Sequence, residues 1–372
     1  MRATYLLPVP SHVRYWKRIR GLEEEGVRPE TVLSFRRPYY EGAELPHPVE
    51  YLGRHSNRRY AGRIPSLLGS VPRTRRAARS ADVLYAFGLD MALLAFLAVT
   101  TVRSRPLLVY EVGDIASGQL RRDAVGTAVR WVERRILRRA DLLVVTSSAY
   151  LSGYYEGWVN VRPRAVRVVE NKLGGLELPP RPPAREGPAG VIRIGWFGNL
   201  RCPRSWEILK RAAAAAEGRV RVHVRGLNRA VPGLEEEARS GEGLSYGGTY
   251  AWPDDLPGMY GDVDLVWAAY PYAGEGPGNW MWARTNRFYE SAYFGRPMVV
   301  QRGTEDARAV EERGAGLALD LGDPEGSVER LLGLSLEEVA AMASGARSIP
   351  ESDYLYTDEH ASMARLFESL RG

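Results

Sequence analysis

Short apolar segments alternate with longer amphipathic segments along most of the chain, and this alternation predicts the fold. In the first half the apolar segments are residues 3–9, 82–88, 106–114, 141–147 and 166–171. In the second half the pattern returns at residues 191–200, 220–226, 264–271 and 297–302. Strands that alternate with helices in this way are typical of a parallel α/β sheet with helices on both faces.

The stretch between the two halves differs in composition. Residues 174–190 are rich in proline and glycine and show no hydrophobic period, which indicates a linker. We therefore expect an α/β protein of two tandem Rossmann-like domains, residues 1–173 and 191–350, each a doubly wound parallel sheet, facing a cleft. Ligands bind at the carboxyl ends of the strands in such sheets, so the cleft is the predicted site.

One helix of the second half carries several polar groups at its start. The pattern predicts a short amphipathic helix over residues 285–295, followed by a buried strand. Asn286 and Glu290 lie one turn apart on the same face, with Arg287 beside them. A carboxylate at that position can accept two hydrogen bonds from a ribose diol. The alternative interpretation is an ordinary ion pair between Glu290 and Arg287.

The segment WFGNLRCPRSW, residues 196–206, has the features of an anion site. It predicts a strand, a glycine turn, a basic loop and the start of a helix. Gly198 permits close approach to free backbone N–H groups, and Arg201 and Arg204 supply guanidinium groups that suit phosphate oxygens. The segment matches neither the Walker A pattern nor the GxGxxG pattern, so a purely structural turn is the alternative.

Composition places both halves in a globular protein of a reducing compartment. A chain of 372 residues with 45% hydrophobic and 26% charged residues suits two folded domains. The single cysteine, Cys202, excludes an intramolecular disulfide. The first residues make a poor signal peptide, and the longest apolar stretch, residues 88–102, contains Asp90 and is too short to span a bilayer. A cytoplasmic location is therefore expected.

Positive charge is concentrated in the first half. Only three of the 51 basic residues are lysines, and residues 53–80 and 130–140 are especially rich in arginine. Such segments suit an anionic membrane surface, which would make the protein peripheral on the inner face of a membrane, and a merely solvated arginine-rich face is the alternative. Nucleic acid is not an expected partner, because the sequence contains no zinc pattern, aromatic RNA-binding signature or recognition helix.

Two segments of the second half resemble motifs of the GT-B-fold glycosyltransferases of the retaining family four, which build bacterial surface polysaccharides and glycolipids. WFGNLRCPRSWEILKRA, residues 196–212, is similar to the family's G-R-L-x-x-x-K-G stretch. TNRFYESAYFGRPMVV, residues 285–300, is similar to its N-K-x-x-E-x-x-x-x-G-x-P-V segment. In the first half, residues 8–22, 109–115, 144–150 and 166–173 extend the resemblance to nearly the whole chain.

The resemblance implies an enzyme that moves a sugar, with retention, from a nucleotide-diphosphate sugar to an acceptor. Gly198 and Arg204 would contact the diphosphate, and Glu290 would hold the nucleotide ribose. A sugar, a lipid-linked compound or another small molecule would be the acceptor in the first domain, and residues 351–372 would form a helix that returns to that domain. No cofactor is implied besides the nucleotide-sugar co-substrate.

Three positions depart from the family's pattern. Asn199 stands where the family has an arginine, and Arg201 is a substitute close by. Trp282 stands where the family has the first of two glutamates, and Gly113 stands where it has a histidine. The contacts to the donor sugar and to the acceptor therefore need other residues.

Several residues are candidates for these contacts. Glu275 and Asn279, in the loop before the 285–295 helix, are candidates for the donor sugar. Tyr250 is a candidate for stacking on the nucleotide base, as is the tryptophan two residues later. Asp114 and His12 are the catalytic or acceptor-orienting candidates of the first domain. For His12, a loop histidine without a catalytic task is an equally good interpretation.

The triplet Asp262-Val263-Asp264 matches the Asp-x-Asp signature with which GT-A glycosyltransferases hold a divalent metal. Two carboxylates at this spacing are common by chance, and a metal site needs further ligands. Asp264 precedes an apolar strand, so we interpret it as a capping residue and expect no metal.

Two other functions remain open from the sequence. One is a GT-B-fold enzyme that does not transfer sugars, such as a sugar-nucleotide epimerase, although five histidines are few for acid/base chemistry across a cleft. The other is a non-catalytic subunit that binds nucleotide without consuming it, which the three departures from the family's pattern suggest.

Overall fold

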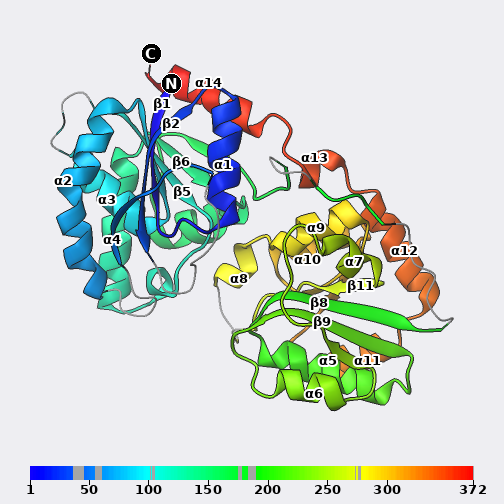
Figure 1. Ribbon diagram of the computed structural model, residues 1–372. Helices are drawn as coiled ribbons and strands as arrows, with labels where there is room; N and C mark the ends of the chain where they lie inside the picture. Colours follow the sequence, from blue (N-terminus) through cyan, green and yellow to red (C-terminus); the bar gives the residue numbers. More distant parts are fainter. Residues whose placement is uncertain are drawn as a thin grey trace. The chain divides into compact units, whose positions relative to one another are not determined.

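The computed structural model describes residues 1–36, 46–54, 61–100, 102, 105–174, 178–182, 190–272, 274 and 278–371. The chain forms two compact units (Figure 1). Unit 1 comprises Met1–Asn171 together with Tyr356–Gly372, and unit 2 comprises Lys172–Leu355. The C-terminal segment therefore belongs to the same unit as the N-terminus.

Unit 1 is built on a parallel sheet of seven strands. The strands are β1 (Arg2–Leu7), β2 (Arg28–Arg36), β3 (Glu50–Arg54), β4 (Val83–Phe87), β5 (Leu107–Val112), β6 (Leu142–Val145) and β7 (Val166–Val168). Their order across the sheet is β3-β2-β1-β4-β5-β6-β7, which is doubly wound, with the switch between β1 and β4. The central strands are buried on both faces, which is why their sequences are continuous apolar runs.

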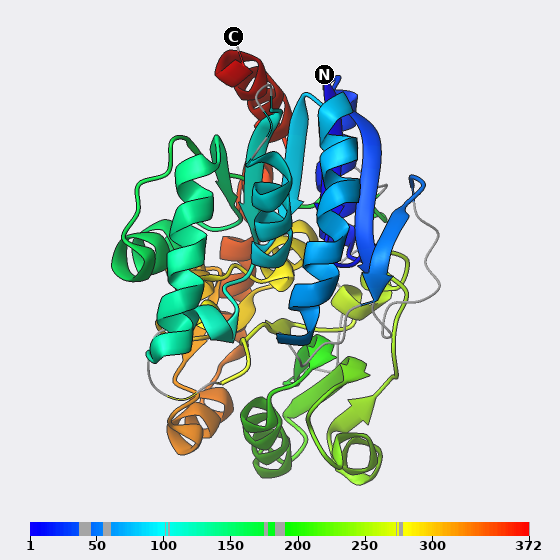
Figure 2. The ribbon, with the colours of Figure 1, turned by 90° about the vertical axis from the view of Figure 1, so that its left-hand side faces the viewer.

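Helices cover both faces of this sheet (Figures 1 and 2). They are α1 (Val13–Glu24), α2 (Ile64–Ser80), α3 (Leu89–Val99), α4 (Ala124–Arg139) and α14 (Glu359–Arg371), with shorter turns η1 (Ala61–Arg63) and η2 (Ser117–Leu120) and the π-helix η3 (Leu151–Val159). Tyr5 and Leu7 of β1 join one core with Phe367 of α14. Thr4 points the other way and donates a hydrogen bond to the carbonyl of Ala77 in α2 at 3.3 Å.

Unit 2 repeats the architecture with six parallel strands. They are β8 (Ile192–Leu200), β9 (Val220–Asn228), β10 (Leu244–Tyr246), β11 (Leu265–Trp267), β12 (Met298–Gln301) and β13 (Gly316–Leu319). The order is β10-β9-β8-β11-β12-β13, so the switch point lies between β8 and β11. The two doubly wound parallel sheets confirm the α/β class predicted from the sequence.

The helices of unit 2 also lie on two faces. They are α5 (Pro203–Ala215), α6 (Leu234–Ser240), α7 (Leu256–Gly261), α8 (Asn279–Trp282), α9 (Asn286–Phe294), α10 (Glu305–Glu312), α11 (Pro324–Leu332), α12 (Leu336–Arg347) and α13 (Glu351–Tyr354). One core joins the sheet to α5, α6 and α11. Two smaller cores join it to α7, α9 and α10.

The helix predicted at residues 285–295 is confirmed as α9. Thr285, in extended conformation, is its N-cap, and Gly295 follows its last turn with φ +62°. A positive φ is the usual way to end a helix, and glycine adopts it without strain. Arg296 then donates its backbone N–H to the carbonyl of Ser291 at 2.8 Å, and the chain enters β12.

Asp264 has a structural role that agrees with its interpretation as a capping residue. Its carboxylate accepts the backbone N–H of Arg193 at 2.8 Å and also the guanidinium of Arg193 at 2.8–2.9 Å. These bonds join the start of β11 to the start of β8. The expectation that the protein needs no metal stays a prediction.

Candidate functional site

The last residues of β8 bring three of the predicted residues together, and Gly198 lies within this strand, paired with Gly226 of β9, rather than in the turn that the sequence predicted. Gly198 has φ +101°, and a Cβ atom built on it would lie 2.5 Å from Nη1 of Arg287 and 3.7 Å from the hydroxyl of Tyr250. Nη1 of Arg287 donates to the carbonyl oxygen of Phe197 at 3.0 Å. Both the left-handed backbone and the close guanidinium therefore require glycine here. The contact places the first turn of α9 against the carboxyl end of β8.

Glu290, also on α9, is held by aromatic hydrogen-bond donors. Its side chain is buried, with 8% of the residue surface exposed. One carboxylate oxygen accepts the indole N–H of Trp252 at 3.1 Å, and the other accepts the hydroxyl of Tyr260 at 2.8 Å. Burial, followed by the charge of Glu290, raises the pKa of Tyr250 to about 12. The Tyr250 hydroxyl therefore stays protonated at neutral pH.

Arg201, Arg204 and Asn279, a second group of predicted residues, contact two tyrosines of the loop after β11. The guanidinium of Arg201 lies 5.2 Å from the ring centroid of Tyr270, and the Tyr270 hydroxyl accepts the side-chain amide of Asn279 at 3.0 Å. Arg204 lies 5.5 Å from the ring centroid of Tyr272. Such cation–π contacts hold the two guanidinium groups at the carboxyl ends of β8 and β11.

Cys202 joins the loops that carry these groups. It is the N-cap of α5, and its sulfur accepts the backbone N–H of Ser205 at 3.3 Å. The same sulfur accepts the backbone N–H of Tyr272 at 3.3 Å, so the loop after β8 is tied to the loop after β11. No local pattern in the sequence places Cys202 at this junction, because its partner Tyr272 is 70 residues away.

A buried carboxylate accepts a backbone hydrogen bond at the N-terminus of α9. Asp306 of α10 accepts the backbone N–H of Thr285 at 3.2–3.3 Å, and burial raises the pKa of Asp306 to about 6. Asn286, the first residue of α9, is exposed, as is Asn199 in β8. Trp282, which replaces a glutamate of the family's pattern, is buried in α8 and carries no charge to the site.

The two catalytic candidates of unit 1 lie at the carboxyl edge of its sheet. His12 is the N-cap of α1, and its Nδ1 accepts the backbone N–H of Arg14 at 3.4 Å. Burial, with the positive charges of Arg14 and Lys17, lowers the pKa of His12 to about 3, so its imidazole is neutral at physiological pH. Asp114 follows β5, and its side chain is 65% exposed.

Arg14 is a candidate that the sequence interpretation missed. A Cβ atom on Gly113 would lie 1.4 Å from Nη1 of Arg14, so the guanidinium occupies the space over this glycine. Nη1 also lies 4.0 Å from a carboxylate oxygen of Asp114. The family's histidine is therefore replaced by a glycine with a cation above it. The glycine at position 113 was the one signal in the sequence. It does not indicate which residue fills the space above it.

One predicted residue, Glu275, lies outside the described part of the chain. The remaining candidates of the second half, from Gly198 to Glu290, all lie in unit 2, in β8 or in the segments that follow β8, β10 and β11. The structure thus places them at the switch point of the second sheet, where open parallel sheets bind ligands.

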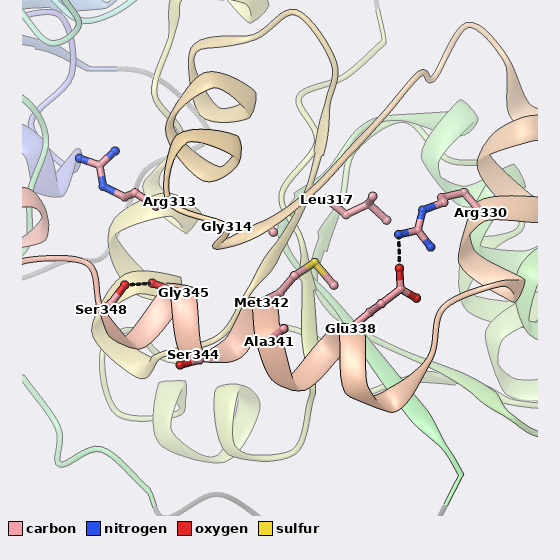
Figure 3. A pocket seen from close by; sticks show the side chains of 11 residues that line it. Arg313, Gly314, Leu317, Arg330, Glu338, Ala341, Met342, Ser344, Gly345 and Ser348 are labelled. Atoms are coloured by element: carbon pink, nitrogen blue, oxygen red, sulfur yellow. Dashed lines mark hydrogen bonds and ion pairs between the residues drawn. The ribbon is translucent and has the colours of Figure 1, made fainter.

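A separate pocket of about 590 Å³ lies beside β13 in unit 2 (Figure 3). Arg330 of α11 donates to Glu338 of α12 at 2.8 Å next to it, and Leu317 and Met342 add apolar surface. None of the residues that the sequence singled out lines this pocket. The pocket is therefore not part of the candidate site, which lies at the carboxyl ends of β8 and β11.

Comparison with known proteins identifies the family. The glycosyl transferase 4-like domain matches residues 12–172. The succinoglycan biosynthesis protein ExoL of Rhizobium meliloti (strain 1021) is 33% identical over 300 residues, which are 77% of this chain and 72% of ExoL. This chain belongs to the glycosyl transferase 4-like family. It is therefore a glycosyltransferase, and the resemblance seen in its motifs is confirmed.

Solved structures share the fold of this glycosyltransferase over its whole length. Sucrose-phosphate synthase from Thermosynechococcus elongatus superposes with a TM-score of 0.76 at 14% identity, covering 100% of this chain and 99% of the synthase. HepE of Anabaena, solved with UDP-glucose, superposes with a TM-score of 0.68 at 17% identity, covering 99% and 100%. At these identities the likeness shows the GT-B fold alone. Among the described residues of the glycosyltransferase, no helix is both long and apolar enough to cross a membrane.

Proposed function

We propose that unit 2 binds a nucleotide-diphosphate sugar and that the enzyme transfers the sugar, with retention at the anomeric carbon, to an acceptor bound by unit 1. HepE, which shares the fold, has been solved with UDP and with UDP-glucose, and this supports a donor of that class. ExoL is by name a protein of succinoglycan biosynthesis. We accordingly propose an acceptor in the assembly of a surface polysaccharide or glycolipid.

The position of Glu290 is the observation that carries this proposal. Two aromatic donors, Trp252 and Tyr260, fix its two oxygens, and some of its surface remains accessible. Arg287, one turn earlier, ties the same helix to the carboxyl-terminal part of β8 at Gly198. A fixed carboxylate next to the end of a strand at a sheet's switch point suits a ribose diol that lies beside a diphosphate.

The diphosphate would be met by Arg201, in the short loop between β8 and α5, and by Arg204, in the first turn of α5. The two guanidinium groups lie on Tyr270 and Tyr272, at the N-terminus of α5, where the helix dipole adds partial positive charge. These groups would stabilise the negative charge that grows on the leaving diphosphate in the transition state. Asn279, on the same tyrosine as Arg201, is a proposed contact of the donor sugar.

The acceptor would meet the carboxyl edge of the sheet in unit 1. Asp114 offers an exposed carboxylate that can accept a hydrogen bond from a sugar hydroxyl. His12, neutral and with Nδ1 already accepting a hydrogen bond, would present its Nε2–H as a donor. Arg14 adds a cation above Gly113 for an anionic group. We propose these three residues for acceptor orientation.

The test is thermal stabilisation by UDP, GDP, CDP, TDP and ADP, each with and without EDTA. A ligand that binds only the folded protein raises the unfolding midpoint. We expect one nucleotide to raise the midpoint of the wild type regardless of EDTA, and Glu290→Gln to lose most of that shift. Release of nucleoside diphosphate from the matching donor sugar, on addition of acceptor, then separates an enzyme from a non-catalytic binder.

Glu237→Gln is the matched control for this test. Glu237 also accepts a tryptophan indole N–H, that of Trp206, at 2.6 Å, but it lies on α6, which packs on the other face of the same sheet. The substitution should leave the nucleotide shift unchanged. If no nucleotide stabilises the wild type, or if both variants lose the shift equally, the proposed donor site is wrong.

A further inference from the structure

One face of unit 1 exposes several large apolar side chains. Helices α2, α3 and α4 lie side by side on this face (Figures 1 and 2). Ile64 and Leu68 of α2 and Val125 and Trp131 of α4 are each 54–56% exposed. Isolated exposed apolar residues are common, but four such residues on two helices of one face form a patch that needs a partner.

The helix between them continues the apolar surface. Along α3 the partly exposed apolar residues recur at helical spacing: Leu89, Leu93, Phe96 and Leu97. Asp90, the carboxylate of this helix, pairs with Arg63 at 2.7 Å, so its charge is compensated. The apolar surface of α2 and α4 is therefore bridged by α3 without an uncompensated negative charge.

The same face is strongly basic. Helices α2 and α4 contain nine arginines and a single carboxylate, Glu133, which is fully buried. Six of these arginines are exposed: Arg73, Arg76, Arg79, Arg135, Arg138 and Arg139. Among the described residues none of the six forms an ion pair with a carboxylate. The guanidinium of Arg135 lies 4.9 Å from the ring centroid of Trp131, which keeps a cation next to the exposed indole.

The two kinds of side chain are segregated along the helices. Both α2 and α4 follow a strand and precede the next parallel strand, so their first turns lie at the carboxyl edge of the sheet. Ile64, Leu68 and Val125 lie in the first two turns of their helices, and Trp131 lies further along α4, next to Arg135. The six exposed arginines lie in later turns, towards the opposite edge. The face thus has an apolar end and a basic end, with Trp131 between them on α4.

We propose that the α2–α3–α4 face docks on the surface of an anionic lipid bilayer. Aliphatic side chains and tryptophan enter the boundary between head groups and acyl chains, and arginines bind anionic head groups. Charge complementarity selects this partner, because the face carries a large excess of arginine. A nucleic acid would use the arginines but would leave Ile64, Leu68 and Val125 exposed to water, so it fits the observations less well.

Sedimentation of the full-length chain with vesicles tests the proposal. The wild type should bind vesicles that contain phosphatidylglycerol at low salt, bind much less in 0.5 M salt, and not bind vesicles of pure phosphatidylcholine. Arg76→Gln with Arg138→Gln should weaken partitioning about 25-fold, since each basic residue near the surface contributes about fivefold. Leu68→Ser with Trp131→Ser should weaken it by about tenfold or more at constant charge.

A control variant and a second ligand make the test decisive. Leu336→Ser removes a side chain that is 45% exposed on α12 of unit 2, and it should bind vesicles as the wild type does. Unchanged unfolding midpoints would show that all variants are folded. The proposal is overturned if the wild type does not bind anionic vesicles at low salt, or if neither double variant weakens binding. It is also overturned if the arginines bind duplex DNA or RNA more tightly than vesicles, without any effect of Leu68 or Trp131.

Discussion

Each unit has a buried carboxylate on a helix, and the two carboxylates differ in whether a ligand can reach them. Glu133 of α4 accepts hydrogen bonds from four side chains of unit 1: Tyr110, Gln119, Tyr154 and Tyr155. The carboxylate of Glu290 in α9 accepts hydrogen bonds from Trp252 and Tyr260. Glu133 is completely enclosed, whereas 8% of Glu290 is exposed. Both are carboxylates among aromatic donors, but only one can be reached by a ligand.

Their positions in the sheets explain the difference. Glu133 lies in the third turn of α4, away from the carboxyl edge, and its donors come from β5, η2 and η3, so it locks those elements together. Glu290 lies in the second turn of α9, next to the switch point of the second sheet. A buried carboxylate is therefore not in itself a sign of a site, and access at the carboxyl edge is what points to ligand binding.

Removing the enclosed carboxylate should have the largest effect on stability. Glu133→Ala leaves several buried hydroxyl and amide groups without an acceptor, each at a cost of about 1–3 kcal/mol. We expect the free energy of unfolding to fall by about 3–5 kcal/mol. Chemical denaturation measures this loss. The affinity of the folded fraction for nucleotide should not change, and a large change in that affinity would break the distinction between the two carboxylates.

A third buried carboxylate, Asp306, should make stability depend on pH. Its pKa is raised from 3.8 in the unfolded chain to about 6, so the folded state binds the proton more tightly. The stabilisation by that proton is fully present below pH 3.8 and is lost as the pH rises through 6. A shift of about two pH units corresponds to about 3 kcal/mol.

Asp306→Asn isolates this contribution. The variant keeps a side-chain oxygen for the backbone N–H of Thr285 but cannot ionise. The difference in unfolding free energy between the variant and the wild type should therefore change by about 3 kcal/mol in favour of the variant between pH 4 and pH 7. Denaturation curves at several pH values check this. A difference that is constant with pH would show that Asp306 does not titrate in this range.

The accessible carboxylate should affect binding more than folding. Glu290→Gln keeps the shape of the side chain and an acceptor for one aromatic donor, so we expect a loss of stability of about 1 kcal/mol. A hydrogen bond to a charged group contributes about 1.5–3 kcal/mol, so nucleotide affinity should fall about 10- to 100-fold. Calorimetric titration measures both this fall and the unchanged affinity of Glu237→Gln.

The exposed carboxylate of unit 1 should have the smallest effect on stability. Asp114 is 65% exposed and lies 4.0 Å from Arg14, and such surface pairs contribute about 0–1 kcal/mol. Asp114→Asn should therefore change the unfolding midpoint very little. If Asp114 orients the acceptor, sugar transfer should still slow markedly while nucleotide binding is unchanged. Equal rates for wild type and variant would remove Asp114 from the site.

Local signals were enough to predict the central strands and helix α9, but β2, β3, β10 and β13 were not among the predicted strands. The apolar run at residues 298–300 became β12, and the polar start and glycine stop around α9 placed that helix within a residue of its bounds. These predictions succeed because a strand's burial and a helix's caps are encoded within a few neighbouring residues.

The candidate site could be predicted only in part, because its contacts join distant residues. Gly198 and Glu290 could be found from motifs, although Gly198 lies within β8 and not in the predicted turn. The donor Tyr260 is 30 residues from Glu290, and nothing local pairs them. Arg14 and Gly113 are separated by almost a hundred residues and meet only because β1 and β5 end at the same edge of the sheet. Such pairs depend on topology, which composition and periodicity do not specify.

A thermodynamic cycle tests the proposed contact between Glu290 and the ribose diol. The stabilising nucleoside diphosphate and its 2′,3′-dideoxy analogue are titrated into the wild type and into Glu290→Gln. We predict that loss of the diol weakens binding to the wild type about 10- to 100-fold and weakens binding to the variant hardly at all. An equal loss in both proteins would show that the ribose hydroxyls do not contact Glu290 and that the proposed donor site is wrong.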